Sequence, residues 1–132
     1  MKKYIFITSV IFVLILLFCF FQVRSMVKFN DESIGFAKFI YGDTQVETKI
    51  SDQNLKQIVE ILKGKILKSD LPSCGFTENV SVKIDDKTFC IACDECGVIY
   101  LLEEDKYLYL SDEENKIIRK ILESYEFKFP CV

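Results

Sequence analysis

Five cysteines in the polar part of the chain are the residues whose type and spacing could do chemistry: Cys74, Cys90, Cys93, Cys96 and Cys131. A sixth lies in the apolar N-terminal run, at position 19. The chain has no His, which excludes Ser–His and Cys–His nucleophilic pairs and imidazole metal ligands. Five thiols are an odd number, so at least one stays free, links to another chain or binds something else.

Strand geometry limits which thiols can pair. Cys90 and Cys93 lie three residues apart on one predicted strand, which separates their Cα atoms by about 10 Å, beyond the roughly 7 Å limit for a disulfide. Cys93 and Cys96 flank a predicted turn, where the Cα separation can fall below about 7 Å. The hairpin register brings Cys96 close to Cys74. We therefore expect Cys74, Cys93 and Cys96 to gather, with a disulfide from Cys74 to Cys93 or to Cys96.

The same thiols allow a metal or redox interpretation. Four thiolates suit tetrahedral Zn²⁺, and the chain offers Cys74, Cys93, Cys96 and Cys131, although their spacing differs from paired C-x2-C knuckles. Thiol–disulfide exchange needs a thiol of low pKa, whereas Asp94 and Glu95 surround these thiols with negative charge. We keep zinc binding and thiol redox chemistry as the alternative to structural disulfides.

Residues 90–97, Cys-Ile-Ala-Cys-Asp-Glu-Cys-Gly, resemble the first three ligands of the bacterial ferredoxin motif, C-x2-C-x2-C. The resemblance implies an iron–sulfur cluster. Tyr100 stands where that motif has its fourth cysteine, and no second motif follows. We therefore do not expect a cluster here.

Acidic residues form four short groups, and each falls at a predicted turn or first helical turn: 85–86, 94–95, 103–105 and 112–114. Carboxylates at such places are typical of solvated ends and of helix-dipole partners. The sequence also contains no Gly-rich phosphate loop. These observations favour a protein that is not an enzyme.

The elements that position these residues begin with an 18-residue run, 4–21, interrupted only by Thr8 and Ser9. A helix of this length spans about 27 Å, close to the hydrocarbon thickness of a bilayer. Lys2 and Lys3 precede it, as in an export signal, and the positive-inside tendency keeps them in the cytoplasm. We divide the chain into an anchor or signal (1–25), a short tether (26–33) and an extracytoplasmic domain (34–132).

Three outcomes remain open for the apolar run: a retained single-pass anchor, cleavage after Ser25 with secretion, or lipidation at Cys19. Each places residues 26–132 outside the cytoplasm. That part carries 14 bases and 20 acids, a net charge of −6. An acidic domain argues against nucleic acid as a partner.

Apolar patterns predict the elements of the domain. Alternating or continuous apolar stretches predict strands at 34–41, 44–50, 80–84, 88–93, 98–102 and 107–110. Helical spacing predicts one helix between Ser51 and Gly64 and another after Ser111. We summarise the fold as α+β, order ββαβββα, with both helices packed on one face of an antiparallel sheet.

If both helices cover one sheet face, the other face exposes Phe36, Ile40, Tyr107 and Tyr109. Exposed aromatic and aliphatic groups could form a partner surface for another protein of the cell envelope. Alternatively, the tether or the C-terminal segment 127–132 covers them. The sequence leaves both possibilities open.

The sequence therefore predicts a non-catalytic, membrane-tethered or secreted binding domain without a cofactor, stabilised by disulfides. The membrane would hold it through residues 4–21. The alternative is a thiol-redox or zinc protein that uses Cys74, Cys93 and Cys96. The high content of Lys, Ile and Phe is typical of a low-GC bacterium.

Overall fold

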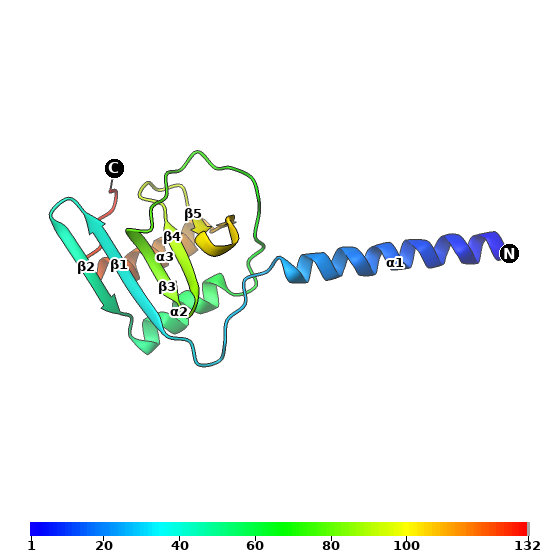
Figure 1. The fold of residues 1–132 in the computed structure, drawn as a ribbon, viewed down its shortest axis with the longest axis horizontal. Coiled ribbons are helices and arrows are strands. Elements are labelled where there is room, and N and C mark those ends of the chain that lie inside the picture. The colour runs from blue at the N-terminus through cyan, green and yellow to red at the C-terminus, as the bar shows by residue number, and fades with distance from the viewer. Residues whose placement is uncertain (132) are drawn as a thin grey trace.

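The computed structural model describes residues 1–131, with the side chains of 22–24 left out. One long helix leads into a domain of six strands and two further helices, and a single 3₁₀ turn lies between two strands (Figure 1). The order is α1 (Lys2–Arg24), β1 (Gly35–Tyr41), β2 (Thr44–Lys49), α2 (Asp52–Leu62), β3 (Val80–Ile84), β4 (Lys87–Ile91), β5 (Val98–Leu101), η1 (Leu102–Glu104), β6 (Lys106–Tyr109) and α3 (Asp112–Glu123).

Helix α1 projects away from the domain (Figure 1). Its 20-residue apolar stretch, Lys2–Phe21, is long enough to cross a bilayer, and none of it is buried against the rest of the chain. At 1.5 Å per residue, 20 residues span about 30 Å, the thickness of the hydrocarbon core. A helix that is apolar on all sides and finds no protein partner is typical of a membrane span or a signal sequence.

The strands form one antiparallel sheet in the order β2-β1-β3-β4-β5-β6. Gly42-Asp43 makes the predicted two-residue turn, and Gly42 has a φ of +58°, as such hairpin turns require. The register pairs Phe39 with Val46 and Ala37 with Thr48, as expected from that turn. β1 then inserts between its hairpin partner β2 and the later strand β3.

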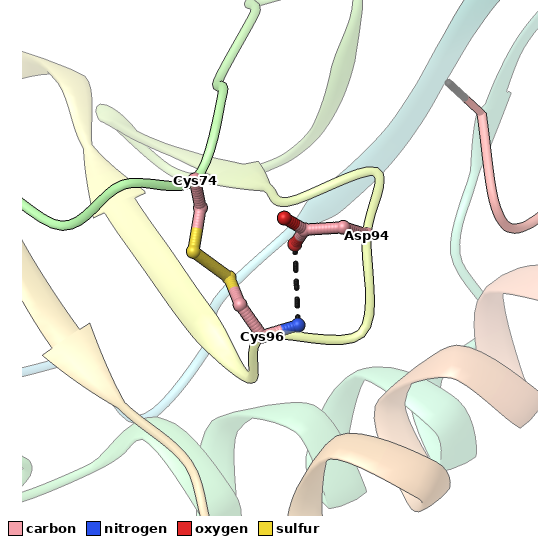
Figure 2. A group of neighbouring side chains, drawn as sticks. All are labelled: Cys74, Asp94 and Cys96. Carbon is pink, nitrogen blue, oxygen red and sulfur yellow. Dashed lines mark hydrogen bonds between the residues drawn. A yellow bond between two sulfur atoms is a disulfide. The ribbon is translucent and has the colours of Figure 1, made fainter.

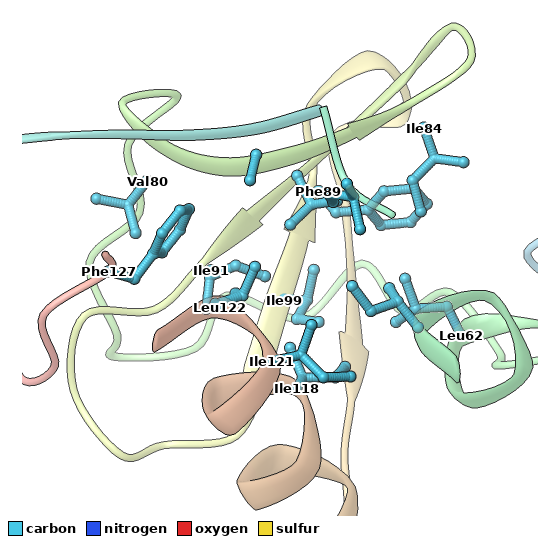
Figure 3. Close-up of a cluster of buried hydrophobic side chains, with 14 of the residues drawn as sticks. Leu62, Val80, Ile84, Phe89, Ile91, Ile99, Ile118, Ile121, Leu122 and Phe127 are labelled. Carbon is cyan, nitrogen blue, oxygen red and sulfur yellow. The ribbon is translucent and has the colours of Figure 1, made fainter. Parts of the chain in front are cut away.

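Both α2 and α3 cover the same face of the sheet. Each begins at a serine whose side chain accepts a hydrogen bond from the backbone three residues later, and Ser111 with Glu114 forms the complete capping box. Figure 3 shows Leu62 of α2 and Ile118, Ile121 and Leu122 of α3 directed at the sheet. They meet inward side chains of the strands, among them Val82, Ile84, Phe89, Ile91, Ile99, Leu101 and Leu108.

The α+β class and the one-sided arrangement of the two helices are confirmed. The order ββαβββα roughly matches the structure but is one strand short: four strands, β3 to β6, follow α2, at the four segments that the apolar patterns predict. The charged residues 103–105, expected as a turn, form the 3₁₀ turn and a left-handed Asp105 between β5 and β6.

Residues 26–33, expected to be a short tether, are part of the folded domain. Val27 is 2 % exposed, and the Phe29 ring lies 5.7 Å from that of Phe89. Met26 forms an antiparallel bridge with Ile66. The sequence signal was weak because only Met26, Val27 and Phe29 are apolar, in a segment too short for a regular strand. No free linker therefore separates α1 from the domain.

This docking predicts that Val27→Asp destabilises the full-length protein in detergent, lowering the free energy of unfolding by more than about 3 kcal/mol. An unpaired carboxylate would be buried at that position. The matched control is Lys28→Asp, because the neighbouring side chain is exposed. Chemical denaturation measures both. Equal, small effects of the two changes would show that the segment is a tether after all.

Candidate functional site

The thiols gather where β4 ends and β5 begins. Cys74, in the connection between α2 and β3, is bonded to Cys96, with Cα atoms 6.6 Å apart (Figure 2). This is one of the two pairings that hairpin geometry left open for Cys74. The bridge fastens a connection without regular secondary structure to the loop before β5. Closing a loop of 22 residues stabilises the fold by roughly 3 kcal/mol in the chain-entropy description.

Cys93 pairs with Cys131, at a Cα separation of 4.8 Å. The Cys131 backbone N–H also donates to the Cys93 carbonyl at 3.2 Å. Beside this bridge, buried Arg119 of α3 donates to the Ala92 carbonyl at 3.1 Å and lies 4.4 Å from the centre of the Phe129 ring. Burial lowers the pKa of Arg119. Arg119 thus connects α3 to the chain beside Cys93 and to the chain near Cys131.

The remaining thiol of the domain, Cys90, is buried and free. It lies on β4, across from Ser81 on one side and Tyr100 on the other. Burial raises the pKa of its thiol to about 11, with the charges of Glu78 and Glu103 adding to the effect. Because the thiolate is the reactive form, Cys90 is inert near neutral pH.

Asp94 lies beside the Cys74–Cys96 bridge. Its carboxylate accepts a hydrogen bond from the Cys96 backbone N–H at 3.1 Å, which Figure 2 shows as a dashed line. The ligand atoms of Cys74, Asp94 and Cys96 lie within 4.8 Å of one another. A metal could use the two sulfurs as thiolates only after the disulfide had been reduced, and Cys93 is bonded elsewhere. The oxidised arrangement is that of a structural bridge beside a negative charge.

The sheet face opposite the helices is divided into a covered and an open part. Phe76, in the connection between α2 and β3, stacks at 5.8 Å on Tyr100 and at 5.6 Å on Tyr107. Tyr107 is consequently only 9 % exposed, and the Tyr109 hydroxyl donates to the Asp70 carboxylate. The two tyrosines expected at the partner surface are therefore covered or engaged. Neither predicted cover does this: Phe29 packs on Phe89 and Phe127 on Phe39, rings that belong to the core between the sheet and the helices.

Phe36 and Ile40, on β1, stay on the open part of this face. Phe36 is 44 % exposed and borders a hollow of about 440 Å³. Charged side chains of both signs surround this hollow, which we call the β1–β3 hollow: it is lined by Phe36, Lys38, Glu47, Glu78, Ser81, Lys83, Asp85 and Thr88. A single aromatic side chain surrounded by charges of both signs suits contact with a polar protein surface better than binding of a small apolar ligand.

Phe76 and Arg119 decide the layout of both regions, and sequence reasoning did not select either. Phe76 lies in a segment without periodicity, so its partners depend on the path of the chain. Arg119 comes directly after two residues of the apolar stripe of α3, and a charged residue there is expected to face solvent. The acidic groups at 85–86 and 103–105 do contribute locally: Asp85 accepts from Ser33 and from the Ile34 backbone, and Glu103 accepts from the Thr88 backbone.

Comparisons with protein-family models, with curated proteins and with solved structures found no match to this chain. The features of the molecule that bear on its function are therefore an apolar helix, two disulfides and one open region of the sheet.

The bridges predict a large loss of stability on removal. Replacing Cys93 and Cys131 together by Ser should lower the free energy of unfolding by about 4 kcal/mol, and the Cys74/Cys96 pair by about 3 kcal/mol, since the latter closes the shorter loop. Cys19→Ser, within α1, is the control and should change it by less than about 0.5 kcal/mol. Denaturation of the oxidised protein in detergent measures all three. A loss below about 1 kcal/mol for both pairs would contradict a structural role.

Proposed function

We propose that this protein is a membrane-tethered extracytoplasmic domain that binds another protein through the open part of its sheet. The observation that carries this proposal is a domain with two disulfides that follows an apolar helix of membrane-spanning length. Disulfides persist in oxidising compartments and are rare where thiols are kept reduced. Lys2 and Lys3 before the helix favour an orientation with the domain on the far side of the membrane.

The binding surface we propose is the β1–β3 hollow with Phe36 at its border. An exposed aromatic ring supplies apolar contact area, while the charged side chains around it, Lys38, Glu47, Lys83 and Asp85, select a partner by charge. The Lys38 ammonium and the Glu78 carboxylate lie 3.9 Å apart, and both are partly exposed. Such a pair contributes little to stability and can exchange partners on binding.

The alternative function, thiol redox or zinc chemistry at Cys74, Cys93 and Cys96, receives less support. Cys74 and Cys96 form one bridge and Cys93 forms another with Cys131. Cys90, the one free thiol of the described domain, is buried. Zinc retained by the protein as isolated, without added reductant, would favour this alternative over the binding function.

The location predicts that alkaline phosphatase fused after residue 131 is active in cells, because that enzyme needs an oxidising compartment. The intact mass of the untreated protein should lie about 4 Da below that of the reduced protein, about 2 Da for each bridge. The control fusion joins the enzyme to the N-terminus, ahead of α1, and should be inactive. Activity in the reverse pattern, together with four free thiols, would refute the extracytoplasmic location.

The binding surface predicts site-specific cross-linking in intact cells. A photoreactive phenylalanine analogue at position 36 should yield one adduct of defined mass on illumination. The matched control is the same analogue at Ile117, which is 45 % exposed on α3, on the other side of the sheet. Lys83→Glu should reduce the adduct at position 36 severalfold, because it reverses a charge beside the ring. Equal adducts at positions 36 and 117, or none at either, would contradict the proposed surface.

A further inference from the structure

We propose that residues 63–71, which we call the juxtamembrane segment, rest on anionic lipid headgroups of the membrane that α1 spans. This inference rests on the membrane anchor of the proposed function and adds a fixed orientation of the domain to it. The partner is therefore the lipid surface itself.

Chain geometry places this segment at headgroup depth. The apolar stretch of α1 ends at Phe21, and the Ser25 backbone N–H still donates to the Phe21 carbonyl at 3.2 Å. Four residues of helix advance about 6 Å. The Leu67 backbone N–H donates to the Ser25 carbonyl at 2.8 Å. Because a headgroup layer is roughly 5–8 Å thick on each side, Leu67 and its neighbours lie within or just above it.

The segment is held firmly to the domain. Val27 donates to the Lys65 carbonyl and Gly64 to the Val27 carbonyl, each at 3.0 Å. Lys68 exchanges two backbone hydrogen bonds with Tyr107 of β6, at 2.7 and 2.8 Å. These bonds extend the sheet past β6, through the juxtamembrane segment, to the residues that follow α1. The segment therefore keeps its place beside the residues that follow α1, and the charges and apolar groups that it presents decide whether it rests on lipid.

A salt bridge fixes the same segment to α3. The Lys65 ammonium donates to the Glu114 carboxylate at 2.6 Å. Partial burial opposes the charge on Glu114, but hydrogen bonds from Lys65 and Ser111 outweigh it and lower its pKa. Lys65 is therefore engaged within the protein, and the lysines that can reach lipid are Lys63 and Lys68.

The composition of the segment suits a headgroup surface. Leu71 is 86 % exposed, more than any other large apolar side chain in residues 25–131, and Ile66 is 45 % exposed. With Lys65 paired to Glu114, the segment presents Lys63, Lys68 and Asp70, a net charge of +1 within a domain of net charge −6. Asp70 accepts the hydrogen bond of Tyr109, and the Lys68 ammonium lies 5.0 Å from the Tyr109 ring centre. Exposed apolar groups flanked by lysines are typical of surfaces that bind anionic lipid.

The arrangement in space agrees with this placement. Figure 1 shows the connection between α2 and β3 running along the side of the domain from which α1 emerges. The β1–β2 hairpin lies at the opposite side. Contact with lipid at the juxtamembrane segment therefore leaves the hairpin in solvent.

The absence of Trp from the chain allows a direct test. Leu71→Trp and, as a second probe, Ile66→Trp are compared with Tyr41→Trp, which replaces an exposed ring at the distal hairpin. The full-length variants are reconstituted in vesicles of phosphatidylcholine and phosphatidylglycerol that carry lipid brominated near the headgroup. Bromine should reduce the emission at positions 71 and 66 at least twofold and leave that at position 41 within about a tenth of its unquenched value.

A charge variant identifies the lipid chemistry. Adding Lys63→Gln and Lys68→Gln to the Leu71→Trp protein, or omitting phosphatidylglycerol, should remove most of the quenching at position 71. Equal quenching at positions 71 and 41, or quenching at position 71 that neither change affects, would overturn the inference. Vesicles present lipid on both sides, so this result is independent of the compartment that the domain occupies in cells. A failed fusion experiment would refute the proposed function and leave the lipid contact standing.

Discussion

The seventeen residues between α2 and β3 are the segment on which the rest of the structure depends. They form no helix and no regular strand, yet they contact the residues that follow α1, strand β6 and the loop before β5. Their first residues pair with the chain that follows α1 and with β6. Further along, Phe76 covers Tyr107, and Cys74 bonds to the loop before β5. Ordering so much irregular backbone costs about 1–2 kcal/mol per residue, which the bridges, the stacked rings and the disulfide must offset.

Local rules predicted the elements well because the elements depend on local physics. Leu55, Ile58 and Leu62 recur at helical spacing and are all buried. The serine at position 111 and the glutamate three residues later form the capping box that their spacing indicates. Boundaries differ by a residue or two, as at β4, expected over 88–93 and found at Lys87–Ile91.

The parts that sequence reasoning missed depend on the path of the chain in space. The rise per residue of a strand was enough to exclude a bond between Cys90 and Cys93. No spacing rule constrained Cys131, because it reaches Cys93 only where the C-terminal segment folds back over α3. The contact of Phe76 with Tyr107 was missed for the same reason, because a single aromatic residue in an aperiodic loop gives no signal of the strand that it will contact. Periodicity indicates which face of an element is apolar, but it does not indicate which distant segment covers the opposite face.

The connection of α1 to the sheet bears on whether the anchor is kept. Ser25 is the residue after which cleavage was considered, and its carbonyl is the acceptor for Leu67. Cutting there would leave Val27 buried but would turn that acceptor into part of a released peptide, at a cost of about 1 kcal/mol for the lost hydrogen bond. A retained helix instead keeps the Ser25 carbonyl in place as an acceptor, and the residues that follow it stay bonded to the connection after α2. On the proposed function, a partner of the β1–β3 hollow must then reach it at the height above the bilayer that this attachment sets.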